Sequence, residues 1–187
     1  EESRSGARRF GGSPRSASVA IASLLLFVCA IGMFAGDGGT FLAYVTNKGS
    51  DTISVIDTST NTVVATVTAG AGPRDITIAK RGDKNFAYFT NEKDGSVMVL
   101  DRRTNTIVDT FLSVGTRPVG IAIGPKNEKL YVADYSDNTI AVIDLATRTI
   151  TQVDVGATTS LVTMSKDGAK AYFTQTTSAM IAVVDTA

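Results

Sequence analysis

The sequence has 187 residues, with 18 basic and 18 acidic side chains and a formal net charge of zero. This length is enough for one domain with a sizeable core, and the balanced charge gives no indication of a nucleic-acid partner. The sequence contains one cysteine, Cys29, and no histidine, which excludes within this chain an internal disulfide framework, a Cys/His zinc site, a histidine-based nucleophilic triad and a histidine-ligated haem.

An uncharged apolar run follows an arginine-bearing flank at the start of the sequence. The run covers residues 19–35 (VAIASLLLFVCAIGMFA). It is slightly longer than the usual signal core of ~7–15 residues and close to the lower limit of ~17–25 residues for a spanning helix. We expect residues 1–40 to be an export signal peptide or an N-terminal membrane anchor helix, with a buried helix as a third alternative. In the first two cases the rest of the chain is exported, to the cell surface, the periplasm or the exterior, and touches the membrane only through this segment.

From Phe41 onward the sequence repeats itself. Four tyrosines mark the copies at intervals of 44, 43 and 41 residues: Tyr44, Tyr88, Tyr131 and Tyr172. An aspartate follows each tyrosine thirteen positions later: Asp57, Asp101, Asp144 and Asp185. A period of ~40–45 residues is typical of propeller blades rather than of leucine-rich or helical repeats. We expect the repeat domain to cover residues 41–187, with copies that begin near Phe41, Phe86, Leu130 and Ala171.

Each copy contains four short apolar stretches separated by turn residues. In the first copy these are FLAYVT, TISVID, TVVATV and, after a loop with glycine and proline, DITIA at residues 75–79. Val, Ile, Thr and Tyr dominate the stretches, and Asn, Asp, Gly and Ser fill the gaps, as in strands and hairpins. The runs are apolar on both faces, as in a sheet packed between two neighbours. The sequence therefore predicts an all-β protein, a β-propeller of four-stranded antiparallel blades of which about three and a half are present.

Two of the copies carry a recognisable motif. Residues 44–47 (YVTN) and 88–91 (YFTN), each followed by a strand that ends in aspartate and by a TNT-type turn, resemble the YVTN-type β-propeller repeat family. The resemblance covers roughly residues 41–187, although Asp134 and Gln175 stand where the first copy has Asn47. It implies an exported or cell-surface protein of the kind found in bacteria and archaea, including surface-layer proteins, with a protein or cell-envelope partner.

The number of copies indicates whether the propeller can close within this sequence. A closed propeller has about 4–8 blades, whereas an open arc leaves apolar blade faces in contact with water, which is unfavourable. We therefore expect this chain to be part of a longer propeller, with seven blades as the expected number, or else to close by association.

Strand order predicts which loops share one end of the blades. The turns NKGSD, NEKDGS and DYSDN should lie beside the loops GAGPRD and VGTRPVG around one mouth of the central channel, where ligand-binding loops are expected. Arg74 and Asp75 stand at the start of one innermost strand, and Arg117 precedes the next. We expect these three side chains near the channel, where they either bind an anionic ligand or form ion pairs.

The other repeated polar residues are interpreted as turn formers. Asp and Thr side chains in DTSTNT, DRRTNT and DLATRT can bond nearby backbone groups, and equivalent positions of neighbouring blades lie too far apart for a catalytic carboxylate pair. Residues 91–96 (NEKDGS) and 135–138 (YSDN) offer oxygen ligands for Ca²⁺ but match no calcium-loop spacing. We therefore predict no catalytic residue, metal site or cofactor in this chain.

Three functions remain open at this point. The favoured one is a non-enzymatic, exported propeller that serves as a binding or structural scaffold, since charge, repeat regularity and the N-terminal segment all agree with it. The second is a propeller enzyme of lactonase or lyase type whose active-site residues lie mainly in further blades. The third is a periplasmic redox partner similar to the haem d1 domain of a nitrite reductase, which the absence of histidine disfavours. Fold alone does not choose among them.

Overall fold

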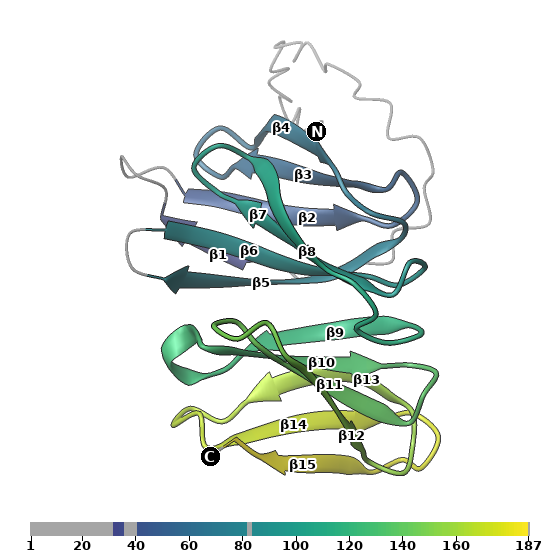
Figure 1. Cartoon of the computed structure of the whole chain (residues 1–187). Coiled ribbons are helices and arrows are strands. Elements are labelled where there is room, and N and C mark those ends of the chain that lie inside the picture. Colours follow the sequence, from purple (N-terminus) through teal and green to yellow (C-terminus); the bar gives the residue numbers. More distant parts are fainter. Residues whose placement is uncertain (1–31, 36–40, 82–83, 187) are drawn as a thin grey trace, which may run out of the picture.

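A computed structural model describes residues 32–35, 41–81 and 84–186 of the chain. These residues form four antiparallel sheets, here called blades 1 to 4, which lie one below the other in Figure 1. Blade 1 contains β1 (Gly32–Ala35), β2 (Phe41–Asn47), β3 (Thr52–Asp57) and β4 (Thr62–Thr68), and blade 2 contains β5 (Pro73–Arg81), β6 (Lys84–Asn91), β7 (Ser96–Asp101) and β8 (Thr106–Phe111). Blade 3 contains β9 (Pro118–Ile123), β10 (Lys129–Asp134), β11 (Thr139–Asp144) and β12 (Ile150–Asp154), with a 3₁₀ helix, η1 (Pro125–Asn127), between β9 and β10. Blade 4 contains β13 (Thr159–Met164), β14 (Lys170–Gln175) and β15 (Ile181–Asp185).

The strands of each blade follow one another in sequence order. The first strands of neighbouring blades contact one another, since β9 contacts both β5 and β13, so they form the inner edge of the stack. The stretch DITIA lies in β5 and pairs with β6 of the next sequence copy, with Ile76 opposite Phe89. Each blade therefore takes its first strand from the end of the preceding copy. Blades 2, 3 and 4 begin at Pro73, Pro118 and Thr159, one strand earlier than the copies expected to begin near Phe86, Leu130 and Ala171.

Blade 1 begins inside the segment that was expected to be an export signal or anchor helix. Gly32–Ala35 is the strand β1, which pairs with β2 so that Gly32 lies opposite Tyr44. The expectation of a helix is wrong for these residues, because the inner edge of β2 offers backbone hydrogen bonds that a fourth strand can use. The rest of the expected helix, up to residue 31, lies outside the described residues. Among the residues that are described, no helix is both long enough and apolar enough to cross a membrane.

The core consists of apolar layers between neighbouring blades. Tyr44 and Val55 of blade 1 pack against Phe89 and Leu100 of blade 2, and Tyr88 of blade 2 packs in the same way against Leu130 of blade 3. The layer between blades 3 and 4 joins Val119, Tyr131, Ala133 and Ile140 to Ala171 and Phe173. Each buried strand thus carries apolar side chains on both faces, as the sequence predicted. The repeated tyrosines of blades 1 to 3 are core residues.

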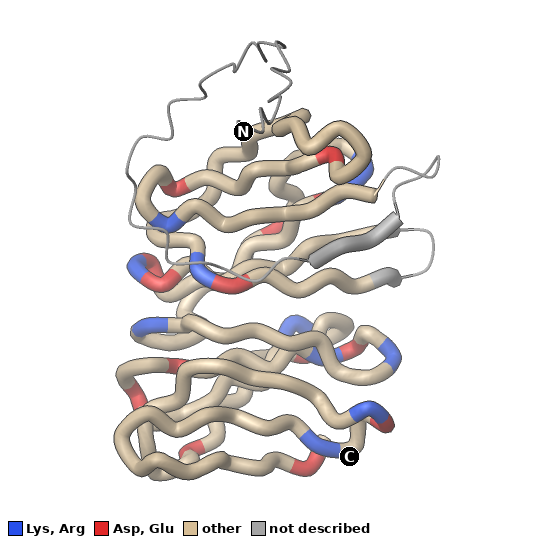
Figure 2. The backbone as a smooth tube through the Cα atoms, turned by 180° about the vertical axis from the view of Figure 1, so that it is seen from behind, with Lys and Arg blue, Asp and Glu red and all other residues tan. Residues whose placement is uncertain are grey.

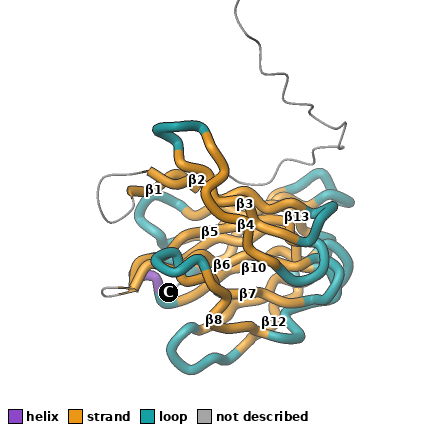
Figure 3. Tube along the Cα trace, turned by 90° about the horizontal axis from the view of Figure 1, so that it is seen from above, coloured by secondary structure: helices purple, strands orange, loops and turns teal. Residues whose placement is uncertain are grey.

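The repeated polar turns hold the hairpins between the last two strands of blades 1, 2 and 3. Asp57, Asp101 and Asp144 accept backbone N–H bonds from residues two positions later, at 2.8–2.9 Å. The paired threonines of these turns lie in hydrogen-bond contact across the hairpin: Thr60 and Thr62, Thr104 and Thr106, Thr147 and Thr149. Figure 3 shows the loops and turns of the chain at the ends of the strands, and these three turns share one end because each joins the last two strands of its blade. These contacts agree with the interpretation of the repeated Asp and Thr residues as turn formers.

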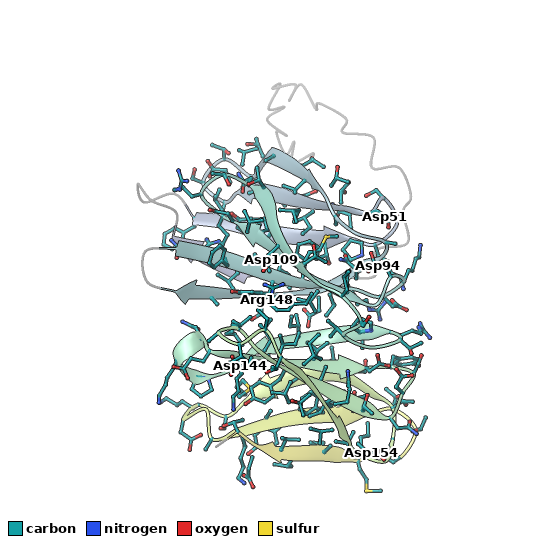
Figure 4. The ribbon with its side chains drawn as sticks, in the orientation of Figure 1. Asp51, Asp94, Asp109, Asp144, Arg148 and Asp154 are labelled. Carbon is teal, nitrogen blue, oxygen red and sulfur yellow. The ribbon has the colours of Figure 1, made fainter. Side chains whose placement is uncertain are left out.

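A charged contact joins blades 2 and 3 on their outer side. Arg148, in the turn between β11 and β12, forms an ion pair with Asp109 of β8, and its guanidinium lies 4.5 Å from the ring centre of Phe111. Figure 4 shows Arg148 and Asp109 facing each other across the junction. The left-handed backbone of Arg148, with φ of 64°, occupies the turn position where blades 1 and 2 have Asn61 and Asn105. An arginine at a position that favours asparagine therefore gains a cross-blade contact.

The outward face of blade 4 has no neighbouring blade in the structure. Tyr172 is half-buried there, and Leu161, Ile181 and Val183 are exposed. Val183 lies opposite Tyr172 in the ladder, as Val55 lies opposite Tyr44 in blade 1 and Val99 opposite Tyr88 in blade 2. The residues that form buried layers in the inner blades are thus repeated on an uncovered face.

Candidate functional site

Charged side chains gather where the loops enter the inner strands. Figure 2 shows that Lys, Arg, Asp and Glu lie mainly at the ends of the strands and in the loops. One end carries the turns after β2, β6 and β10 together with the loops that lead into β5 and β9; Asp51, Asp94 and Asp154 mark this end in Figure 4. We call this end the mouth. The structure places Arg74, Asp75 and Arg117 at the mouth, where β5 and β9 begin.

The centre of the mouth is a buried carboxylate, Glu92. Its side chain is 5% exposed and lies in the turn that follows β6. Lys48 of blade 1 approaches it with Nζ at 2.5 Å from Oε2, and Arg117 donates a hydrogen bond to Oε1. Arg74 Nη1 lies 3.7 Å from Oε2, which is an ion-pair distance beyond hydrogen-bond range. Cationic side chains from the turn after β2, the start of β5 and the loop before β9 therefore converge on one carboxylate.

Backbone pairing explains why Glu92 is held there. The N–H groups of Glu92 and Lys93 donate to the carbonyl oxygens of Gly72 and Ala71, at 2.9 and 3.1 Å. This continues the pairing between β5 and β6 past a bulge at Arg74 and Asp75. Such bulges re-aim side chains at a strand end. The carboxylate of Glu92 is thereby fixed over the start of the inner strands.

The electrostatics of Glu92 follow from these contacts. Burial of the carboxylate is the largest influence and opposes ionisation, but the hydrogen bonds from Lys48 and Arg117, with the positive charge of Lys48 and Arg74, outweigh it. The pKa of Glu92 therefore lies below its usual value. Glu92 is ionised at neutral pH, and Asp75 and Asp134 add further negative charge close to Arg74 and Arg117.

Arg117 is the most exposed member of this group. Its side chain is 45% exposed, and its guanidinium lies 5.0 Å from the ring centre of Tyr135, in the turn after β10. Its backbone N–H donates to Asp134 Oδ2 at 2.9 Å. The aromatic face and the backbone bond fix the direction of the arginine, and a guanidinium carries five N–H donors, so donors remain on the solvent side of the Glu92 contact.

The position of Asp75 in the sequence suggested ligand binding or an ion pair, but its carboxylate accepts backbone hydrogen bonds. Its Oδ1 accepts the N–H of Ile76 at 2.8 Å, and its Oδ2 accepts the N–H of Ile121 at 2.9 Å. Because β9 is the inner edge strand of blade 3, the N–H of Ile121 needs a partner outside its own sheet. Asp75 thus joins β5 to β9. Burial raises the pKa of Asp75, and the two backbone bonds offset this only in part.

A cavity of about 640 Å³ opens beside Arg74 and Asp75. Its remaining walls come from the inner strands of blades 3 and 4 and from the uncovered face of blade 4: Val119, Ser160, Leu161, Val162, Thr163, Tyr172, Thr174 and Ile181. The volume falls within the range of about 300–1,000 Å³ that is usual for ligand pockets. The cavity has a charged end at the mouth and mainly aliphatic and aromatic walls elsewhere.

In the two turns that could have offered calcium ligands, aspartate carboxylates accept hydrogen bonds from backbone N–H groups. Asp94 accepts the N–H of Ala71 at 2.9 Å, and Asp137 accepts the N–H of Thr116 at 3.0 Å. Both carboxylates thereby fasten the loops that lead into β5 and β9. Among the described residues there is no group of three or more Cys, Asp or Glu side chains with the arrangement of a metal site.

Sequence reasoning missed Lys48 and Glu92. They occupy the same position in neighbouring copies, directly after Asn47 and Asn91. A lysine and a glutamate at equivalent positions of adjacent blades are a signal for a cross-blade ion pair, because neighbouring copies bring their equivalent turns close together. Arg74 and Arg117 could then have been assigned to the same carboxylate.

Comparison with known proteins identifies the architecture. Residues 35–110 match the family model described as "Lactonase, 7-bladed beta-propeller". The hydrazine synthase of Kuenenia stuttgartiensis superposes with a TM-score of 0.70 at 22% identity, over 84% of this chain and 45% of that one. The WD40 β-propeller domain of Doa1 superposes with a TM-score of 0.66 at 15% identity, over 86% of this chain and 51% of that domain. The fold is that of a β-propeller.

Two further similarities concern shorter or more distant matches. The propeller matches dihydro-haem d1 dehydrogenase NirN with a TM-score of 0.62 at 14% identity, over 78% of this chain and 33% of that one. The PE-PGRS family protein PE_PGRS18 of Mycobacterium tuberculosis is 46% identical over 48 residues, which are 26% of this chain and 10% of that protein. The propeller chain thus spans about half, or less, of the length of each of these relatives.

Proposed function

We propose that this chain belongs to an exported β-propeller of the YVTN repeat type that acts as a binding scaffold without catalysis of its own, and that its mouth binds an anionic group. The observation that carries the proposal is the convergence of Lys48, Arg74 and Arg117 on Glu92. One carboxylate cannot use every N–H donor of Lys48 and Arg117, so donors remain for a second anion.

The position of the cluster supports a binding role. It lies on loops at one end of a rigid stack of sheets, which is where propellers and other β-scaffolds present their ligand sites. The buried Glu92 holds the three cations together against their mutual repulsion without a bound ligand. A carboxylate, phosphate or acidic surface of a protein or cell envelope has the complementary charge.

The repeat motif and the N-terminal sequence support export. The YVTN and YFTN segments form the ends of β2 and β6 that lead into the mouth, which is consistent with a repeat that places its variable turns on one face. The sequence of the arginine-bearing flank and of the apolar residues 19–35 is typical of exported proteins. We propose the cell surface, the periplasm or the exterior as the location, with a protein or cell-envelope partner.

Titration with inorganic phosphate, followed by NMR of the backbone amides at the mouth, tests this function. We expect shifts confined to the loops around Glu92 and Arg117, weakened by added sodium chloride and reduced about tenfold in affinity by Arg117→Gln. Arg103→Gln removes an exposed arginine from a turn at the opposite end and should leave the titration unchanged. Absence of binding, or equal loss in both variants, would contradict the proposal.

A second function has a specific observation in its favour. The match to the lactonase family model covers β2 to β8, and Asp75, with its raised pKa, lines the cavity. A carboxyl group of raised pKa beside a cavity is a candidate general acid or base. Under this alternative, further active-site residues lie in other blades. Hydrolysis of simple lactones that is abolished by Asp75→Asn, with the fold retained, would favour the enzyme over the scaffold.

A further inference from the structure

The core tyrosine of blade 1 is covered by an arginine of blade 2. The guanidinium of Arg102, in the turn after β7, lies 5.2 Å from the ring centre of Tyr44. Arg102 is only 9% exposed, and the Tyr44 hydroxyl donates to Asn105 Oδ1 of the same turn at 3.3 Å. The junction between blades 1 and 2 therefore contains a buried guanidinium against an aromatic ring, which is a favourable cation–π arrangement.

The next junction has the same tyrosine but a different cover. Leu145 stands fourteen residues after Tyr131, as Arg102 stands fourteen residues after Tyr88. Its side chain is shorter and uncharged, so it cannot reproduce the guanidinium. Arg148 takes the place of Asn105 and pairs with Asp109 on the outer side, as Figure 4 shows. A cavity of about 270 Å³ opens at this place between blades 2 and 3.

The lining of this cavity is both aromatic and acidic. Its apolar part consists of Phe86, Tyr88, Val99, Val108, Phe111 and Leu145. The rings of Phe86 and Tyr88 meet edge to face, with their centres 6.2 Å apart. Two carboxylates, Asp101 and Asp109, also line the cavity, and Asp109 is paired with Arg148. The volume is below the range of about 300–1,000 Å³ that is usual for small-molecule pockets, so the cavity suits a single long side chain.

We propose that this cavity binds an arginine side chain of a partner protein, with its guanidinium against the rings of Phe86 and Tyr88 and paired with Asp101. The precedent is the chain's own Arg102, which makes the corresponding contact one junction earlier. A guanidinium stacks on aromatic rings and pairs with carboxylates, and arginine is enriched among the residues that dominate protein interfaces. This inference goes beyond the proposed function, because the turn that carries Asp101 lies at the end of the strands opposite the mouth.

The position of the cavity does not depend on the number of blades. Blades 2 and 3 each have four strands in the structure, and the cavity lies between them on their outer side. Any further blade would pack at an end of the stack and leave this junction as it is. The outer side of a propeller is also a surface that a partner protein can reach.

Three capped amino acids test the chemistry of the site: the N-acetyl amides of arginine, lysine and norleucine, each titrated into the full chain and followed by NMR of the backbone amides. We expect the arginine compound to shift β6, β8 and residues 145–149, and to bind at least about tenfold more tightly than the norleucine compound, because only arginine adds cation–π and ion-pair contacts. The lysine compound should bind more weakly than arginine, since a guanidinium also stacks on the rings. Equal affinity of the arginine compound and either of the others, or shifts confined to the mouth, would overturn the proposal.

Asp101→Asn and Asp57→Asn form a matched pair of variants. Both aspartates accept the backbone N–H of the residue two positions later, at 2.8 Å, and asparagine keeps an acceptor oxygen for this bond. Asp101→Asn should weaken the arginine compound about tenfold through the loss of a charged partner. Asp57→Asn changes the junction that Arg102 already covers and should leave the titration unchanged. Equal effects of the two variants would overturn the assignment to this cavity.

Leu145→Arg tests the comparison with Arg102 directly, because blade 3 then has the same residue type as blade 2 at this position. The longer side chain should fill the cavity and abolish binding of the arginine compound, whereas Leu145→Met, which nearly conserves volume, should retain it. Circular dichroism and urea unfolding establish that both variants fold. If Leu145→Arg does not fold, the comparison of Asp101→Asn with Asp57→Asn decides. Unchanged binding in a folded Leu145→Arg protein would overturn the proposal.

Discussion

Lys48 and Glu92 occupy equivalent positions in neighbouring blades and lie in contact, with Lys48 Nζ 2.5 Å from Glu92 Oε2. A repeat would normally place the same residue type in both positions and could then form no such pair. Here the charge is reversed between one copy and the next. The reversal creates a buried anionic centre to which Arg74 of the same blade and Arg117 of the next blade are also drawn.

The first prediction concerns the pH dependence of this centre. Because the pKa of Glu92 is lower in the folded chain than in the unfolded one, its contribution to stability is present above the unfolded pKa of about 4.3 and is lost as the pH falls through the folded pKa. Glu92→Gln should lower the free energy of unfolding at pH 7 by about 1.5–3 kcal/mol and should reduce the loss of stability on acidification. Urea unfolding between pH 7 and pH 3 measures both effects.

The matched control is Glu128→Gln, which changes an exposed glutamate next to η1. It should alter neither the stability at pH 7 nor its pH dependence. A Glu92→Gln protein with the same acid sensitivity as the parent chain would show that the ion cluster does not stabilise the mouth.

The second prediction has the opposite sign and concerns Asp75. Its folded pKa is raised by burial, so ionisation costs more in the folded chain, and stability falls as the pH rises from the unfolded pKa of about 3.9 towards the folded value. Asp75→Asn keeps an acceptor oxygen for the N–H of Ile121 and removes the titration. The variant should therefore gain stability relative to the parent chain as the pH increases over this window. A difference that is constant with pH, measured by urea unfolding, would contradict the assignment.

The third prediction concerns the contact between β9 and β13. A Cβ atom at Gly120 would lie 2.5 Å from the carbonyl oxygen of Ser160 and 3.0 Å from the Cα of Leu161. These are backbone atoms, so the strands must separate, and Gly120→Ala should lower the free energy of unfolding by about 1–3 kcal/mol. Hydrogen exchange should become faster in β13 and remain unchanged between β6 and β7. Unchanged exchange in β13 would show that the two blades can absorb a methyl group at this junction.

The fourth prediction compares one position in two blades. Val99 is 4% exposed between blades 2 and 3, whereas Val183, at the same place in blade 4, is 52% exposed. Val99→Asp places an unpaired charge in a core layer and should cost more than about 3 kcal/mol or prevent folding. Val183→Asp should cost within about 1 kcal/mol.

Thermal and urea unfolding of both variants provides the measurement. A large loss of stability in Val183→Asp would mean that the outward face of blade 4 is covered in solution. Val99→Ala serves as the milder change at the buried position, because it removes volume without adding charge and keeps the comparison measurable if Val99→Asp does not fold.

Several features of the fold could be predicted from the sequence because they depend on local chemistry. The tyrosine and aspartate spacing fixed the number of copies, and the turn residues placed the hairpins that the Asp57, Asp101 and Asp144 contacts confirm. Strand order alone predicts that the loops before β5 and β9 share one end with the turns after β2, β6 and β10. In contrast, the strand at Gly32–Ala35 could not be read from composition, since an apolar stretch of this kind serves equally as helix or as buried strand.

What the sequence alone determined is therefore the repeat, the strand pattern and the end of the blades at which the polar loops meet, because periodicity and turn chemistry are properties of short segments. Only the tertiary structure decided which strands and side chains interact with one another. It joined each first strand to the following copy, turned Asp75 towards the N–H of Ile121, and brought Lys48, Arg74 and Arg117 to Glu92. The physical reason is that ion pairs and edge-strand hydrogen bonds form between residues distant in sequence, and their geometry exists only once the blades have packed together.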